Sequence, residues 1–317
     1  MAAITLTGNY ILKNDIDLQE ESWTPLNFNG IFNGNQFVIE GLSNALFNTI
    51  DKAHIYDLLA KGTASNKGNR FGQFVKNAYG SLVERCGFEG SQELAGDTDI
   101  GGFVGRAFDI NDLCKFKECW VVGELTSTKS FGYVVGGFVG GVYTGYSSGI
   151  IFEDCFARYN IKYPSGSTIA STGGFVGYVD SWVTPSFIRC YSACSFQGII
   201  GTNVGGFCGE KSGSPTFTTC YYDTTISGRT DTGKGEPRTT AQMVYPYTDK
   251  HTSGIYVDWG FEEKHITDLT DFDFVFGVPW LHDYDESVNG GYPFLFKKIE
   301  PLVSTCVPFL FKVPKLV

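Results

Sequence analysis

A pentad of glycine, phenylalanine and valine recurs along the chain and constrains the fold more than any other feature. Copies with the sequence Gly-Gly-Phe-Val-Gly stand at 101–105, 136–140 and 173–177, and a copy with Cys in place of Val stands at 205–209. Two degenerate copies precede them. The shared Phe occupies positions Phe47, Phe74, Phe103, Phe138, Phe175 and Phe207, at intervals of 27, 29, 35, 37 and 32 residues. This period lies in the range of solenoid repeats, whose successive copies stack to bury a continuous core.

A second short element follows each pentad. Phe116-Lys117-Glu118-Cys119-Trp120 is representative, and its Cys recurs in the equivalent elements at Cys155, Cys190 and Cys220. Each element is about five residues long and is bounded by turn-forming residues, whereas a helix needs roughly ten. A third short strand follows, as in 120–123.

Three strands per repeat without a helical pattern predict an all-β, right-handed parallel β-helix whose strands lie about 4.8 Å apart. In such a coil, equivalent residues stack on one another. We therefore expect the Phe series to form an interior column and the Cys series to form a second one. The paired glycines should mark a tight corner that needs either positive φ or close approach of neighbouring strands.

The chain divides by composition into four regions. Residues 1–42 are predicted to form an N-terminal cap with the first strands, which Asn-Gly turns separate, and residues 43–228 form the solenoid repeats. Residues 229–299 are predicted to form an irregular exit region. The apolar tail, 300–317, carries Phe309, Leu310 and Phe311 between prolines, and is expected to cap an end of the solenoid or to contact a neighbouring subunit.

Composition supports a folded chain and excludes some partners. Hydrophobic residues make up 42% and charged residues 18%, with 40 Gly, 27 Phe and 17 Tyr, which favours aromatic-rich strands. The net charge is −10 and no basic run occurs, so nucleic acid is not an expected partner. No stretch approaches the roughly 20 apolar residues of a membrane span. Residues 1–11 lack the pattern of a secretory signal, so we expect cytosolic synthesis and assembly, with the virion as one destination; the compartment stays unassigned.

The nine cysteines are interpreted as buried free thiols. An odd number cannot all pair within one chain, although the expected strand spacing would permit disulfides. No Cys-x-x-Cys pair occurs, and the close pairs Cys114 with Cys119 and Cys190 with Cys194 have no neighbouring His. The four His residues form no recognisable catalytic motif. We therefore expect no metal site, no cofactor and no His-based active site.

Paired carboxylates are the other candidates for chemistry. Asp97 with Asp99, and Glu153 with Asp154, are considered as acid and base or as calcium ligands, because β-helical glycosidases use such pairs. The segment Ala95-Gly96-Asp97-Thr98-Asp99 favours an ordinary turn instead.

The turns after the pentads carry aromatic residues at roughly corresponding places on successive repeats. If they stack along one edge, they form an aromatic strip suited to a glycan or a protein partner. Local packing within turns is the alternative. The predicted contact residues are Tyr79, Phe108, Tyr143, Tyr146, Tyr178 and Trp182.

Several ordered blocks also resemble a known family. They are 11–18, 30–35, the pentads, and the exit blocks 220–223, 239–243, 259–261 and 291–295. Together they resemble the GLUG-repeat proteins, β-helical repeats of large surface and adhesin-like proteins. The resemblance implies display, attachment or scaffolding and no shared catalytic residues.

The sequence thus predicts a non-catalytic structural or attachment protein, a component of a larger assembly such as a virion or a surface structure. Its expected partners are other protein subunits, with a glycan as a further candidate. The alternative is a carbohydrate-binding or carbohydrate-active β-helix enzyme of the tailspike kind.

Overall fold

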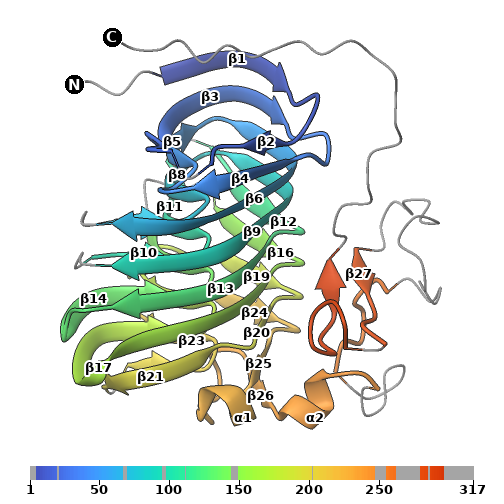
Figure 1. The fold of residues 1–317 in the computed structure, drawn as a ribbon. Helices are drawn as coiled ribbons and strands as arrows, with labels where there is room; N and C mark the ends of the chain where they lie inside the picture. The colour runs from blue at the N-terminus through green and yellow to red at the C-terminus, as the bar shows by residue number, and fades with distance from the viewer. Residues whose placement is uncertain are drawn as a thin grey trace.

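The chain forms an all-β solenoid of stacked parallel strands, as predicted (Figure 1). The computed structural model describes residues 5–19, 21–66, 70–94, 98–110, 112–143, 149–201, 203–246, 255–261, 279–284 and 286–295. Twenty-six strands join one sheet, and neighbouring strands pair in parallel along the coil. The described helices are two short ones, α1 (Thr224–Ser227) and α2 (Thr240–Met243).

Each full turn of the coil, here called a rung, carries the three predicted strands. Wall 1 contains the strand that ends each pentad and continues beyond it: β5 (Phe47–Asp51), β8 (Val75–Tyr79), β11 (Val104–Phe108), β15 (Val139–Tyr143), β18 (Val176–Val179) and β23 (Cys208–Lys211). Wall 2 contains the strand before each Cys: the beginnings of β6 (His54–Asn66) and β9 (Leu82–Leu94), then β12 (Cys114–Lys117), β16 (Ile150–Glu153), β19 (Ser186–Ile188) and β24 (Thr216–Thr218).

Wall 3 contains the longest strands, β6, β9 and β17 (Phe156–Gly173), together with shorter ones. In order they are the remainders of β6 and β9, then β13 (Trp120–Ser127), β17, β20 (Tyr191–Ser192), β21 (Ser195–Ile200), β25 (Tyr221–Asp223) and β26 (Glu236–Arg238). Short strands at the start of the pentads lead back to wall 1: β7 (Phe71–Gly72), β10 (Ile100–Gly101), β14 (Phe131–Gly136) and β22 (Val204–Gly205).

The first 42 residues contribute strands of the coil. Strands β1 (Thr5–Ile11) and β3 (Leu26–Asn33) pair in parallel, as do β2 (Ile16–Asp17) and β4 (Val38–Leu42). Strand β3 then pairs with β5 and β6. The chain between β3 and β4 therefore turns a corner of the coil and does not close an antiparallel hairpin.

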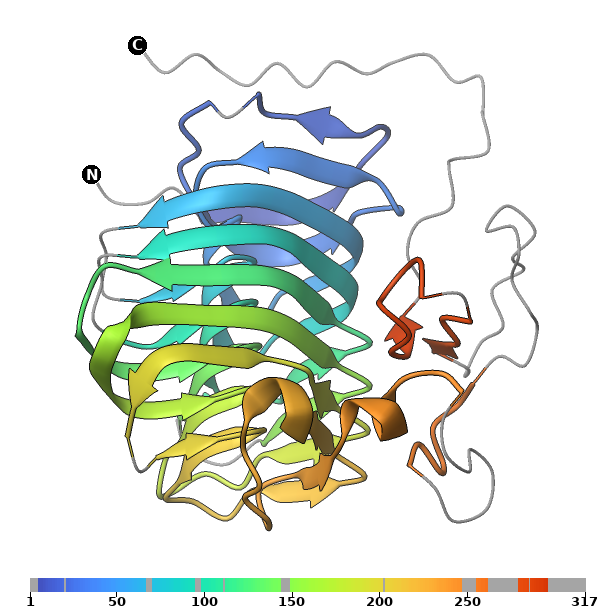
Figure 2. The same cartoon turned by 60° about the horizontal axis from the view of Figure 1, so that its bottom comes forward.

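The described segments of the exit region lie against the outside of wall 3 (Figure 2). After β26, the described segments include β27 (Trp280–Leu281) and β28 (Phe294–Leu295), which pair antiparallel. The Tyr191 hydroxyl donates to the Pro293 carbonyl at 2.6 Å, and the Tyr292 hydroxyl donates to Asp223 at 2.5 Å. These contacts fix the exit region to the rungs around β20 and β25.

Two ladders of phenylalanine rings fill the coil. The first runs from Phe74 through the pentads to Phe207, with ring centroids 4.5–4.9 Å apart. The second comes from wall 2, between Phe116 and Phe217, with centroids 5.0–5.2 Å apart. The two ladders meet edge to face, at interplanar angles of 81–88°. The predicted interior Phe column is confirmed, and edge-to-face contact adds to the energy of apolar burial.

The first member of the predicted Phe series is out of register. Phe47 pairs with Val75, so the alignment of Phe47 with Phe74 was wrong by one residue. The ring of Phe47 still lies against that of Phe74, with centroids 5.7 Å apart. A side chain from the neighbouring position can therefore extend the column.

Close approach, and not positive φ, explains the glycines of the pentads. None of the pentad glycines has φ in the left-handed region. A Cβ on Gly136 would lie 1.9 Å from the Val139 carbonyl oxygen, and one on Gly137 would lie 2.0 Å from the Gly174 carbonyl oxygen. The first glycine lets the pentad fold on itself, and the second lets adjacent rungs touch.

The Cys series forms a second interior column. Cys86, Cys119, Cys155, Cys190 and Cys220 are all buried free thiols. The residue before each has φ of 49–54°, which turns the corner between walls 2 and 3. Each thiol donates to the carbonyl two residues before it, with sulfur–oxygen distances of 3.2–3.5 Å. Cysteine suits this corner because it is small and apolar, yet it supplies a weak donor.

All eight described thiols should be unreactive in the folded chain, because none is more than 1% exposed and a reagent cannot reach the sulfur. Burial raises the pKa of Cys114, Cys194 and Cys208 to about 12. At pH 8 the reactive thiolate is then on the order of one part in ten thousand at those three sites. We expect iodoacetamide to leave all eight described cysteines unlabelled in native buffer and to label them fully in urea, as read by peptide mass mapping. Equal labelling of Cys155 in both conditions would contradict the buried column.

Candidate functional site

Four of the predicted aromatic residues form a continuous ladder on the outside of wall 1. Tyr79, Phe108 and Tyr143 pair in register on β8, β11 and β15, and Tyr178 lies on β18. Centroid distances are 4.7 Å for Tyr79–Phe108, 5.7 Å for Phe108–Tyr143 and 5.8 Å for Tyr143–Tyr178. All four side chains are partly exposed. We call this set the outer ladder.

The other predicted contact residues lie elsewhere. Trp182, in the turn after β18, is 84% exposed and makes no ring contact with the described residues. Tyr146 lies outside the described residues, as do Phe309, Leu310 and Phe311 of the tail.

A buried ion pair holds the centre of the outer ladder. Asp99 is 1% exposed and accepts hydrogen bonds from Arg106 and from the Tyr143 hydroxyl. The guanidinium of Arg106 also lies over the Tyr143 ring, 4.7 Å from its centroid. Burial, and then the charge of Asp99, raise the pKa of Tyr143. The hydroxyl therefore stays protonated and fixes the ring in place.

The stacking of the aromatic rings limits the kinds of ligand that the outer ladder can bind. The rings of Tyr79 and Phe108 lie nearly parallel, at 10°, so each covers a face of the other. The next two contacts are tilted, at 31° and 47°, so the ladder presents a ridge of overlapping rings across successive strands. A sugar ring binds an open aromatic face, whereas a ridge of overlapping rings packs into the surface of a protein.

A second outer aromatic column runs along wall 3, and the sequence analysis missed it. Trp120, Phe156, Tyr191 and Tyr221 each follow a Cys of the interior column directly and pair in register. All four are buried, and they cluster with Trp259, Trp280 and Tyr292 of the exit region. The sequence indicates this column, since an aromatic residue directly follows the cysteines at 119, 155, 190 and 220. That these aromatic side chains point outward depends on the left-handed residue just before each cysteine.

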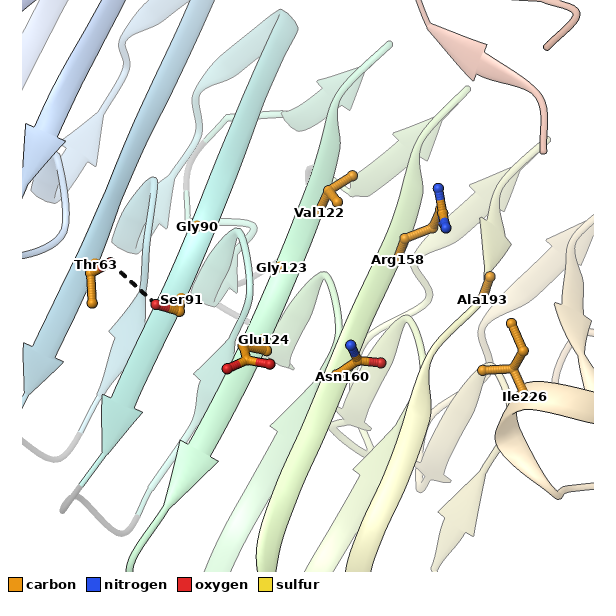
Figure 3. A pocket seen from close by; sticks show the side chains of 10 residues that line it. All are labelled: Thr63, Gly90, Ser91, Val122, Gly123, Glu124, Arg158, Asn160, Ala193 and Ile226. Atoms are coloured by element: carbon orange, nitrogen blue, oxygen red, sulfur yellow. Dashed lines mark hydrogen bonds between the residues drawn. The ribbon is translucent and has the colours of Figure 1, made fainter. Parts of the chain in front are cut away.

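A groove of about 500 Å³ lies beside this column on the outside of wall 3 (Figure 3). It crosses β6, β9, β13 and β17 and reaches α1. The lining residues are Thr63, Gly90, Ser91, Val122, Gly123, Glu124, Arg158, Asn160, Ala193 and Ile226.

A column of polar side chains runs along the groove. Ser91, Glu124, Asn160 and Ser195 pair in register on successive rungs, and Thr63 precedes them. The sequence carried this signal too. Each of the four lies five residues after a Cys of the interior column, at 86, 119, 155 and 190.

Glu153 and Asp154, which the sequence suggested as catalytic candidates, form ion pairs in the structure. Asp154 accepts from Arg189 at 2.6 Å and from the Trp280 indole at 2.9 Å. Glu153 pairs with Lys115 at 2.6 Å and with Arg189 at 2.8 Å. These contacts favour a structural role at the corner between walls 2 and 3. Asp97 lies outside the described residues, and Asp99 accepts the hydrogen bond of Tyr143 in the outer ladder.

The described part of the chain holds neither a cluster of metal ligands nor a membrane-spanning helix. Within those ranges, no three His, Cys, Asp or Glu side chains are grouped as metal ligands. Nor is any helix there long and apolar enough to pass through a membrane.

Comparison with solved structures shows the same fold in other proteins. A structure named "IgA1 Protease" has a TM-score of 0.50 and 18% identity, over 73% of this chain and 20% of that one. A crystal structure of a "putative immunoglobulin A1 protease" from Bacteroides ovatus has a TM-score of 0.50 and 14% identity, over 94% of this chain and 88% of that one. At these identities the likeness shows the β-solenoid fold alone.

Comparison of sequences finds a partial relative. A protein of Evansella cellulosilytica named "Putative Gly-rich membrane protein" is 32% identical over 115 residues. The match covers 35% of this chain and spans 12% of the relative's length. No family model matches the sequence.

Proposed function

We propose that this chain is a non-catalytic β-solenoid that serves as a structural or attachment component of a larger assembly, such as a virion or a surface structure. The observation that carries the proposal is the outer ladder, a ridge of partly exposed aromatic rings on four successive strands. Aromatic residues fixed on a rigid scaffold are typical anchors of protein interfaces. The partner on wall 1 is accordingly another protein subunit.

The surroundings of the ladder support this role. The rings rest on a sheet whose interior holds two continuous Phe ladders, so they lose little conformational freedom on binding. The buried Asp99–Arg106 pair fixes Tyr143 at the centre. The resemblance to GLUG-repeat proteins, with their attachment and scaffolding roles, agrees with the same function.

The proposal predicts that Phe108→Ala weakens docking by about 2 kcal/mol, roughly thirtyfold in affinity, because Phe108 is the middle ring of the ridge. Trp182→Ala is the matched control, since Trp182 is more exposed but lies off the ladder. Incorporation into the native assembly is measured by gradient sedimentation, with thermal unfolding of each variant followed in parallel. Normal incorporation of a folded Phe108→Ala chain, or equal loss in both variants, would overturn the proposal.

The alternative is a carbohydrate-binding function. It is favoured by a different observation, the polar groove of wall 3.

A further inference from the structure

We propose that the groove on wall 3 binds a linear, uncharged polyhydroxylated chain, a β-linked glycan, which lies along the axis of the coil. This groove is separate from the outer ladder, so the proposal of glycan binding does not depend on protein docking at wall 1.

The polar column supplies hydrogen-bonding groups at a regular spacing. Thr63, Ser91, Glu124 and Asn160 come from four successive rungs and lie in a row along the groove (Figure 3). In-register parallel strands repeat about every 4.8 Å. This spacing is close to the length of one sugar unit in an extended β-linked glycan. Successive sugars can therefore meet equivalent polar groups on successive rungs.

Two glycines line the floor of the groove and add no side chain to it, because the packing of adjacent rungs requires glycine there. Gly90 and Gly123 have φ of +156° and +158°, which side chains rarely adopt. An added Cβ would lie 1.9 Å from the Gly62 carbonyl oxygen in one case and 1.7 Å from the Gly90 carbonyl oxygen in the other. Backbone and the small side chains of Val122 and Ala193 thus form a surface on which a flat sugar ring can rest.

The wall of the groove is preorganised. Arg158 donates to Asn289 of the exit region at 2.7 Å and lies over the Tyr292 ring, 5.1 Å from its centroid. The exit region therefore holds the long Arg158 side chain in one place before a ligand arrives, which reduces the entropy lost on binding.

The charges of the groove favour an uncharged glycan. Both charged lining residues are engaged: Glu124 is paired with Lys162 at 2.7 Å, and the Arg158 guanidinium is held by Asn289 and the Tyr292 ring. The chain as a whole carries a net charge of −10, which disfavours a polyanionic polysaccharide.

Ser91 donates to Thr63 at 3.2 Å, and Asn160 Oδ1 accepts from Ser195 at 2.8 Å. Hydroxyls of a neutral sugar can therefore donate to Glu124 and to the Ser91 oxygen. They can also accept from the Thr63 hydroxyl and the Asn160 amide nitrogen.

Titration of the full chain with defined hexasaccharides tests the proposal. The probes are β-1,4-linked hexamers of glucose, xylose and N-acetylglucosamine, with α-linked maltohexaose for comparison. Isothermal calorimetry and saturation-transfer NMR measure affinity. We expect at least one β-linked hexamer to bind more tightly than maltohexaose, and Asn160→Ala to weaken that binding about fivefold through the loss of one hydrogen bond.

Two further variants complete the design. Ser91→Trp should block the groove and abolish binding, whereas Asn29→Ala, at an exposed position on β3, should leave it unchanged. The absence of binding by every β-linked hexamer at millimolar concentration would overturn the proposal. So would binding that Ser91→Trp leaves intact but Phe108→Ala abolishes, since the glycan would then lie on the outer ladder. If maltohexaose bound as tightly as the β-linked hexamers, the proposed match between the strand spacing and the length of a β-linked sugar unit would be wrong.

Discussion

Replacing Phe138 with alanine is expected to lower the free energy of unfolding by about 3–5 kcal/mol, because a buried ring is lost and the core closes only partly over the cavity. Phe138 is fully buried and stacks on Phe103 and Phe175 at 4.9 and 4.8 Å. It also meets Phe116 and Phe152 edge to face, at 6.3 and 5.9 Å. One substitution thus interrupts the first ladder and removes its contact with the second.

Equilibrium unfolding in urea, followed by circular dichroism, measures this effect. The matched control is Phe131→Ala, since Phe131 is 57% exposed on β14 of the same rung. The control should change stability by no more than about 0.5 kcal/mol. Repeat proteins can unfold rung by rung, so the comparison also needs a second probe such as tryptophan fluorescence. Similar small changes in both variants would mean that the Phe ladder does not hold the coil together.

Replacing Gly137 with alanine is expected to destabilise the chain by about 3 kcal/mol or more, since overpacking against backbone leaves little room to relax. The added methyl group would lie 2.0 Å from the Gly174 carbonyl oxygen and 2.7 Å from the Cys194 sulfur. Adjacent rungs would have to separate at this point, which breaks the parallel hydrogen bonds on both sides.

Gly166 provides the matched control for this glycine. It has φ of +82° and no heavy atom within 4 Å of an added Cβ. Gly166→Ala should cost only about 1 kcal/mol, from the left-handed backbone alone. If Gly166→Ala were the more damaging change, backbone conformation and not the contact of rungs would be the main reason for glycine in this coil.

The fold could be predicted because a repeat reports the same environment several times. Six positions of one Phe, five of them followed by a Cys 12 to 17 residues later, were enough to predict parallel stacking and two interior columns. The register of Phe47 could not be predicted from its pentad, since the copy at 72–75 also lacks a glycine pair and yet stays in register with the later copies. Hydrogen bonding and close contacts between rungs decide such details, and they depend on residues distant in sequence.

The candidate sites were predictable only in part. The outer ladder was found because its aromatic residues follow the pentads at similar distances. The groove and the aromatic column under the exit region were missed, although their residues lie five and one positions after the Cys series. Which of these positions face outward depends on residues such as Asp154 and Arg189, whose left-handed φ turns the corner. Non-glycine residues such as aspartate and arginine uncommonly adopt a left-handed φ, so the sequence does not indicate this corner as a glycine would.

Site-specific photo-crosslinking in the native assembly tests the central claim most directly. A benzoylphenylalanine at position 108 stands on the outer ladder, and one at position 124 stands in the groove. If wall 1 is the docking surface, position 108 gives a discrete adduct with one protein subunit and position 124 gives none. A protein adduct from position 124 with none from position 108 would contradict the assignment of wall 1 as the protein-binding face.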